Sequence, residues 1–130
     1  MGLFDKFFGS PSDPDINENG IKWENLTDLS QLDEIIEESN KKIIVIFKFS
    51  TRCGISRMVF KTFEKDFHYT EGEVKCYYLD ILNYRAISNE IADRFKVTHE
   101  SPQLLVLKSG RVIDYKSHGN IDAKSIEKYL

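Results

Sequence analysis

The segment from Ile43 to Phe49 most constrains the fold of this chain. It reads Ile-Ile-Val-Ile-Phe-Lys-Phe, an almost continuous run of apolar and largely β-branched residues. A strand with such a run is covered on both faces, which is typical of parallel sheets with helices on either side. The segment therefore predicts a central strand between two layers of helices.

Strand-like and helix-like patterns alternate regularly around this segment. Strands are expected at 21–26, 43–49, 74–81, 103–108 and 111–115, and helices near 29–36, 53–67, 87–95 and 122–130. A tight turn at Ser109 and Gly110 joins the last two strands. The order βαβαβαββα predicts an α/β fold, with a central mixed β-sheet flanked by helices on both faces.

The helix expected at about 53–67 has an apolar pattern that predicts which side is buried. Five residues are expected on its inner face: Ile55, Met58, Val59, Phe63 and Phe67. The final helix is expected to be capped by Asp122.

Length and composition fit one globular domain. The chain has 130 residues, of which 41% are hydrophobic and 30% charged, enough for a single core. Residues 1–20 are expected to form a flexible N-terminal tail, with a short amphipathic segment followed by a polar linker that contains proline. The amphipathic segment carries four apolar residues at helical spacing: Leu3, Phe4, Phe7 and Phe8. The folded domain is expected to span 21–130.

Charge and cysteine usage exclude several classes of partner and site. A net charge of -3 with interspersed signs offers no basic stripe for a nucleic acid. The two cysteines lie far apart, and the three histidines form no cluster with zinc-site spacing, so neither a disulfide framework nor a metal site is expected. No apolar run approaches the roughly 18 residues of a transmembrane helix. We expect a reduced, monomeric thiol protein of the cytoplasm.

Cys53 lies where the strand-like run gives way to a helical pattern. A helix N-terminus presents free N–H groups and a partial positive charge, which favour a thiolate. Arg52 and the N–H groups of Ile55 or Ser56 are expected to add to this effect. Ser56 follows three residues after Cys53, where a dithiol oxidoreductase has its second cysteine. The pattern C-x-x-S therefore predicts one nucleophile without a resolving thiol beside it.

Ser101 and Pro102 stand at the start of a second buried-strand pattern, Leu104 to Leu107. Proline at the mouth of a strand, together with a cysteine at a strand-to-helix junction, forms the two halves of a thioredoxin-like signature. The Ser101–Pro102 bond is expected to be cis, which turns the preceding backbone toward Cys53 and lets Ser101 pair with an extended substrate.

From about Trp23 to Leu130 the chain resembles a thioredoxin-superfamily domain. The segments 50–56 and 99–103, with sequences STRCGIS and HESPQ, resemble the monothiol bacilliredoxin family. This resemblance implies thiol–disulfide exchange on mixed disulfides of bacillithiol, a low-molecular-weight thiol that some bacteria use in place of glutathione. It implies no cofactor beyond bacillithiol as co-substrate, and S-thiolated client proteins as partners.

The resemblance, together with the residue patterns, assigns a small set of site residues. Cys53 is the expected nucleophile, with Arg52, Gly54 and Ser56 as supporting residues. Ser101 and Pro102 are the expected substrate-binding residues.

Two departures from dithiol thioredoxins are visible. Arg52 replaces the usual tryptophan before the nucleophile, and Phe47 stands where those proteins usually bury an acidic residue. Proton transfer by a buried carboxylate is therefore not expected.

Cys76 lies within a strand pattern and is expected to pack rather than to react. For His99 and Glu100 the sequence favours neither a solvated loop nor a role in tuning the site.

Two other functions stay open at this point. The Cys53–Ser56 segment, C-G-I-S, is similar to the C-G-F-S of monothiol glutaredoxins, which bind an iron–sulfur cluster with glutathione between two subunits. Against that reading, Ser109-Gly110-Arg111 lacks the Gly-Gly turn that those proteins use for glutathione. The third possibility is a non-catalytic thioredoxin-like interaction module, favoured if Cys53 is unreactive.

Overall fold

The computed structural model describes residues 21–130, so the expected N-terminal tail and its amphipathic segment lie outside the described residues. The described chain forms the elements β1 (Glu24–Asn25), α2 (Ser30–Glu38), β2 (Ile43–Phe49), α3 (Gly54–Asp66), β3 (Val74–Asp80), α4 (Arg85–Phe95), β4 (Gln103–Lys108), β5 (Arg111–Ser117), and two 3-10 helices, η1 (His118–Asn120) and η2 (Ala123–Tyr129).

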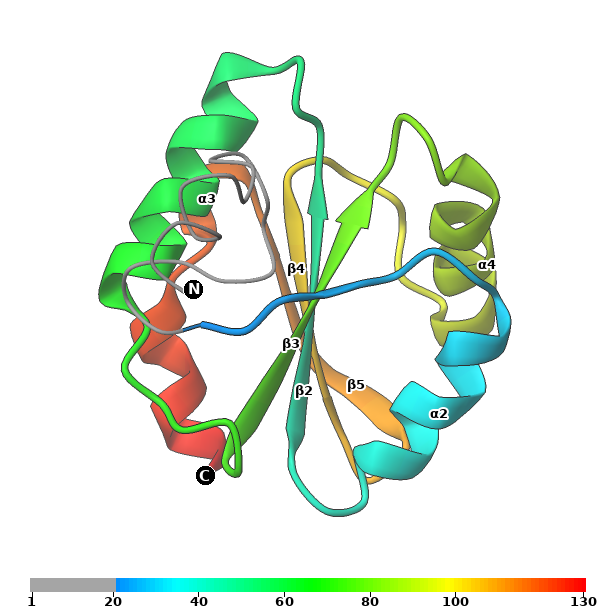
Figure 1. Ribbon diagram of the computed structural model, residues 1–130, viewed down its shortest axis with the longest axis vertical. Helices are drawn as coiled ribbons and strands as arrows, with labels where there is room; N and C mark the ends of the chain where they lie inside the picture. The colour runs from blue at the N-terminus through cyan, green and yellow to red at the C-terminus, as the bar shows by residue number, and fades with distance from the viewer. Residues whose placement is uncertain (1–20) are drawn as a thin grey trace, which may run out of the picture.

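The five strands form one mixed sheet in the order β1-β3-β2-β4-β5. β1 and β2 run parallel to β3, whereas β4 is antiparallel to both β2 and β5. Figure 1 shows α3 and the C-terminal segment on one side of the sheet and α2 with α4 on the other. This arrangement confirms the expected α/β fold with helices on both faces, and it places β2 at the centre.

Strand β2 separates two hydrophobic cores because its side chains alternate between the two faces of the sheet. Four of them point into the core beneath α3: Ile43, Val45, Phe47 and Phe49. Phe47 is fully buried there, with its ring centroid 5.2 Å from that of Phe60 and 5.3 Å from that of Phe63. Each such aromatic pair adds about 0.5–1.5 kcal/mol beyond area burial. The position where dithiol thioredoxins bury an acid is therefore part of an aromatic cluster.

The other face of β2 points toward α2 and α4. Ile44 and Ile46 belong to that core, together with Ile87 and Ile91 of α4. Lys48 continues the same alternation, so its side chain lies on this face, and it has no exposed area. A charged residue in this core was not predicted.

Most element boundaries agree with the sequence patterns, and the differences occur at the ends of the domain. β2 and β4 have the expected limits, but β1 is only two residues long and β5 extends to Ser117. The final helix is a 3-10 helix, and the carboxylate of Asp122 accepts a hydrogen bond from the N–H of Lys124, as a cap should. At the start of α2, the Asp28 carboxylate accepts one from the N–H of Ser30.

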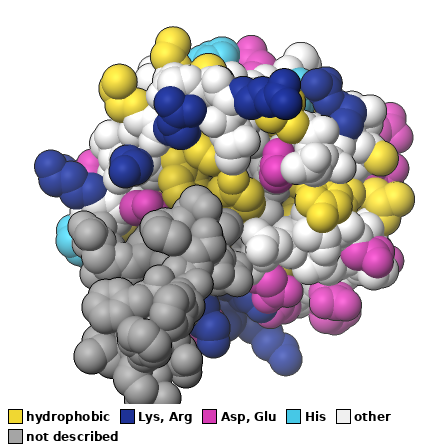
Figure 2. Space-filling view, turned by 45° about the horizontal axis from the view of Figure 1, so that its top comes forward, with side chains coloured by type: hydrophobic (Ala, Val, Ile, Leu, Met, Phe, Trp, Pro, Cys, Tyr) yellow, Lys and Arg dark blue, Asp and Glu magenta, His cyan; other side chains and the backbone are white. Residues whose placement is uncertain are grey.

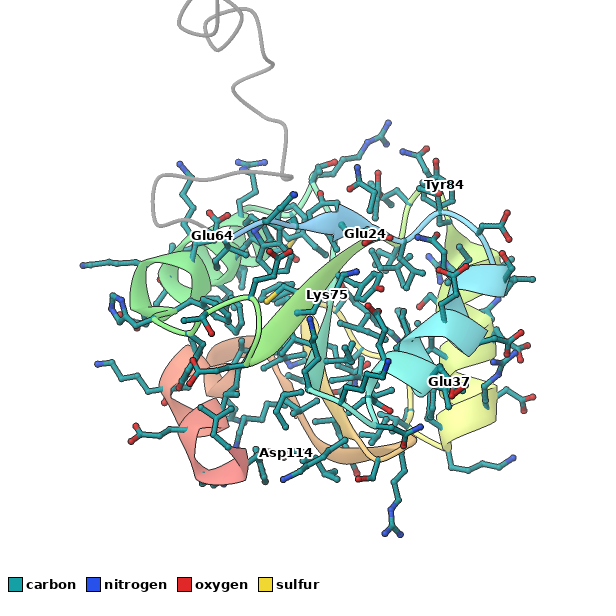
Figure 3. The ribbon with its side chains drawn as sticks, turned by 60° about the horizontal axis from the view of Figure 1, so that its bottom comes forward. Glu24, Glu37, Glu64, Lys75, Tyr84 and Asp114 are labelled. Atoms are coloured by element: carbon teal, nitrogen blue, oxygen red, sulfur yellow. The ribbon has the colours of Figure 1, made fainter. Side chains whose placement is uncertain are left out.

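Ion pairs join the edge of the sheet to α2. Lys75 Nζ on β3 lies 2.9 Å from Glu24 Oε1 and 3.2 Å from Glu38 Oε2, and Figure 3 shows Lys75 and Glu24 on neighbouring strands. These side chains are partly exposed, so the pairs are each worth about 0–1 kcal/mol. Their effect is to fasten the short β1 to its neighbour.

Within residues 21–130, no helix has the length and apolar character needed to cross a membrane.

Candidate functional site

Cys53 is the N-cap residue of α3, as the sequence predicted. Its backbone is extended, with φ −99° and ψ 121°, and the helix begins at Gly54. The Cys53 carbonyl accepts the first hydrogen bond of the helix from the N–H of Arg57, at 3.1 Å. The free N–H groups of the first turn therefore lie beside a cysteine that is partly exposed.

Three contacts from the first turn of α3 lower the pKa of the Cys53 thiol. The largest comes from the N–H of Ser56, followed by the Ser56 hydroxyl and then the N–H of Ile55. Ser56 is fully buried, and its hydroxyl has no other hydrogen-bond partner among the described residues. Once Cys53 ionises, this hydroxyl donates to the sulfur, because a thiolate is a far better acceptor than a thiol. The arrangement favours a thiolate, as the sequence predicted for Ile55 and Ser56.

An arginine that the sequence analysis did not single out also acts on Cys53. Arg57 lowers the pKa of Cys53 further, whereas Arg52 is not among the influences on it. Arg57 also donates from Nη1 to the carbonyl oxygen of Thr51 at 2.9 Å, which keeps its guanidinium near the turn. Arg52 is exposed and precedes the helix. Arg57 therefore adds to the expected effect, and the supporting role of Arg52 stays a prediction.

The inner face of α3 agrees with the prediction for Val59, Phe63 and Phe67, which pack on the core, and differs for Ile55 and Met58. Ile55 and Met58 are 62% and 67% exposed, while Ser56 and Phe63 are buried. Ile55 and Met58 lie on the outer side of the first turns of α3, whereas Phe60 in the same turns packs against the core. Ile55 and Met58 are close to Cys53 in the sequence. Figure 2 shows hydrophobic side chains interspersed with Lys and Arg on this part of the molecule.

Ser101 and Pro102 lie at the same edge of the sheet as the Cys53 turn. Lys48 of β2 pairs with Gln103 of β4, so the segments beyond these two residues emerge side by side at the top of Figure 1. The Ser101–Pro102 peptide bond is cis, as expected. Within the described chain, the Ser101 backbone makes no hydrogen bond and its buried hydroxyl has no partner. Ser101 therefore has free polar groups at the site.

The loop before Pro102 contacts a residue that the sequence analysis missed. His99 Nδ1 lies 3.3 Å from Nζ of the buried Lys48 and 2.9 Å from Oγ of Ser88 on α4. His99 is half-buried, whereas its neighbour Glu100 is exposed. A signal for Lys48 was available, since it is the one charged residue in the apolar run 43–49. Its partner lies 51 residues away, which local patterns do not reveal.

Comparison with known proteins connects this geometry to a family. The model of the family described as monothiol bacilliredoxin BrxC matches residues 24–126. The chain belongs to this family. A solved protein of thioredoxin fold, assigned as an oxidoreductase, is 30% identical with a TM-score of 0.69, and the match covers 82% of this chain and 91% of that one.

Two thioredoxins show the same fold at lower identity. The thioredoxin of Malassezia sympodialis is 22% identical, with a TM-score of 0.61 and 81% and 84% of the two chains covered. Mitochondrial thioredoxin 3 of Saccharomyces cerevisiae is 23% identical, with a TM-score of 0.59 and 82% and 91% covered. Bacilliredoxin membership and a thioredoxin fold together support a thiol oxidoreductase.

The second cysteine of this bacilliredoxin lies in the core. Cys76 on β3 is only 2% exposed, and burial raises the pKa of its thiol. This confirms that Cys76 packs within its strand.

Among residues 21–130, no group of three or more His, Cys, Asp or Glu side chains is placed to hold a metal ion.

Proposed function

We propose that this protein is a monothiol oxidoreductase that removes bacillithiol from mixed disulfides of client proteins, with Cys53 as the nucleophile. The observation that carries the proposal is the contrast between the two cysteines. Cys53 is partly exposed and its pKa is lowered by Ser56 and Ile55, whereas Cys76 is buried and its pKa is raised. Only a thiolate attacks a disulfide, so the reaction is assigned to Cys53.

The exchange proceeds in two balanced steps. The Cys53 thiolate attacks the bacillithiol sulfur of a mixed disulfide, the bond to the client sulfur breaks, and the client leaves as a thiolate that takes up a proton. A second low-molecular-weight thiol then attacks the bacillithiol sulfur of the adduct as a thiolate, forms a small disulfide and releases the Cys53 thiolate. A thiol with a lowered pKa leaves readily, so the contacts from Ser56 favour the second step most.

Client binding is assigned to the segment beside Cys53. The free backbone N–H and C=O of Ser101 suit an extended client segment that adds as a short strand, with Pro102 next to it. Gly54 is assigned a supporting role as the first residue of α3 after Cys53; it borders open space, since a Cβ there would meet nothing within 4 Å. We place the reaction in the reducing cytoplasm, where both cysteines stay thiols and the protein acts as a monomer.

The test uses a model protein that carries one bacillithiol mixed disulfide. Wild-type protein is expected to release the free client thiol and to gain the mass of one bacillithiol on Cys53, as seen by intact mass after acid quench. Cys53→Ser should do neither. A visible absorption band after anaerobic purification would instead indicate an iron–sulfur carrier, and an unreactive Cys53 would indicate an interaction module.

A further inference from the structure

Lys48 is a buried cation that packing does not explain. Its side chain has no exposed area, and its ammonium carries three N–H donors. Among the described residues, its one hydrogen-bond partner is Nδ1 of His99, and no carboxylate pairs with it. Burial lowers the pKa of Lys48 to about 8, so holding the charge there destabilises the fold. A buried lysine that destabilises the fold in this way suggests a role in the site.

The contacts of His99 define its protonation state. An ammonium only donates, so Nδ1 must be the unprotonated nitrogen and the neutral imidazole carries its proton on Nε2. The pKa of His99 is lowered by burial and by the positive charges of Lys48 and Arg85, and Glu100 opposes this in part. The lowered pKa favours the neutral form of His99 at pH 7. Its Nδ1 accepts from Lys48 on β2 and also contacts the hydroxyl of Ser88 on α4.

These contacts join the strand that precedes Cys53 to the loop that carries Ser101, on the α4 face of the sheet. Lys48 is five residues before Cys53, and His99 is three residues before Pro102. Gln103, which faces Lys48 across the β2–β4 pair, donates from Nε2 to the carbonyl oxygen of Thr98 at 3.0 Å. The loop that carries Ser101 is thus tied to β2, β4 and α4 through His99 and Thr98, while Ser101 itself makes no such contact.

We propose that Lys48 and His99 are positioning residues whose hydrogen bond holds the Ser101–Pro102 segment beside the Cys53 turn, in the geometry needed to bind protein mixed disulfides. The inference rests on the proposed function. It assigns the pair to client binding rather than to sulfur chemistry, because the pair contacts α4 on one face of the sheet, whereas α3, which follows Cys53, packs on the other face.

Lys48→Met tests the pair, because methionine keeps most of the length of the stem and removes the donor. Exchange is measured on a bacillithiol mixed disulfide of a model protein and on the disulfide of bacillithiol itself. The KM for the protein substrate is expected to rise about tenfold or more, as the loss of one charge-assisted hydrogen bond predicts. Exchange with the small disulfide, and the rate of Cys53 alkylation, should change less than about twofold. Lys41→Met, at an exposed position, is the matched control.

Two His99 variants separate positioning from general packing. His99→Leu should lose protein exchange as Lys48→Met does, whereas His99→Asn keeps an acceptor near the position of Nδ1 and should recover most of it. Nitrogen NMR of the imidazole gives a readout independent of activity. His99 should carry its proton on Nε2 and titrate below 6.5, and its midpoint should rise in Lys48→Met because one neighbouring cation is gone.

The outcomes distinguish this inference from the proposed function. Wild-type protein that exchanges neither disulfide would overturn the proposed function and the positioning role with it. Active wild-type protein, with Lys48→Met and His99→Leu indistinguishable from Lys41→Met on the protein substrate, would overturn the positioning role alone. Equal losses on both substrates would also overturn it, since they would place the pair in the sulfur chemistry.

Discussion

Ser56 and Cys53 are linked at the start of α3: the amide and the hydroxyl of Ser56 are the two largest influences that lower the pKa of the Cys53 thiol. The residue that replaces the second cysteine of a dithiol motif therefore acts on the first one. Because Ser56 is fully buried, its hydroxyl is held in place rather than lost to water. In this C-x-x-S motif, Ser56 stabilises the Cys53 thiolate, although it cannot serve as a resolving thiol.

Replacing Ser56 with alanine should raise the pKa of Cys53. The wild-type midpoint, measured as alkylation rate against pH, is expected below the ordinary value of about 8.5. Ser56→Ala removes the hydroxyl but keeps the amide, so its midpoint should lie between the wild-type and ordinary values. Identical midpoints in the two proteins would show that the hydroxyl does not act on the sulfur.

The two arginines near Cys53 form a matched pair. Arg57→Gln should raise the alkylation midpoint, because the Arg57 charge lowers the pKa of Cys53, whereas Arg52→Gln should leave it unchanged. The difference should shrink as the salt concentration rises from about 0.1 M to 1 M, since screening weakens interactions between exposed charges. A shift in Arg52→Gln alone would reverse this assignment.

Replacing Cys53 should affect activity, whereas replacing Cys76 should affect stability. Cys53→Ser should abolish release of bacillithiol from a mixed disulfide. Cys76→Ser should keep turnover and lower the free energy of unfolding by about 1–3 kcal/mol, because it buries a hydroxyl in an apolar core. Denaturant unfolding and exchange kinetics measure the two effects. A long-lived Cys53 adduct in Cys76→Ser would identify Cys76 as a resolving thiol and contradict the monothiol mechanism.

Lys48→Met should make the protein more stable at neutral pH. The pKa of Lys48 falls from 10.5 to about 8 on folding, so between these values the unfolded chain binds more protons and wild-type stability rises with pH. Below pH 8 the charged form destabilises the fold by about 3 kcal/mol at most. Urea unfolding should show this advantage of Lys48→Met at pH 7, and it should shrink toward pH 10.5. An advantage that stays constant with pH would contradict the assignment.

The sequence by itself determined the features that depend on neighbouring residues. The apolar run at Ile43–Phe49 predicted β2 with its observed limits, because a strand covered on both faces leaves a continuous pattern. The change from strand to helix periodicity placed Cys53 at the N-cap of α3. The proline at the mouth of β4 and the burial of Cys76 were also readable from their local surroundings.

Only the tertiary structure decided which side chains meet. The rotation of α3 on the sheet buries Ser56 and exposes Ile55 and Met58, and that rotation depends on the aromatic core beneath the helix. The Lys48–His99 contact joins residues 51 positions apart, brought together by the pairing of β2 with β4. Periodicity reports whether a position is covered. It does not identify the distant group that covers it, because chain topology sets that contact.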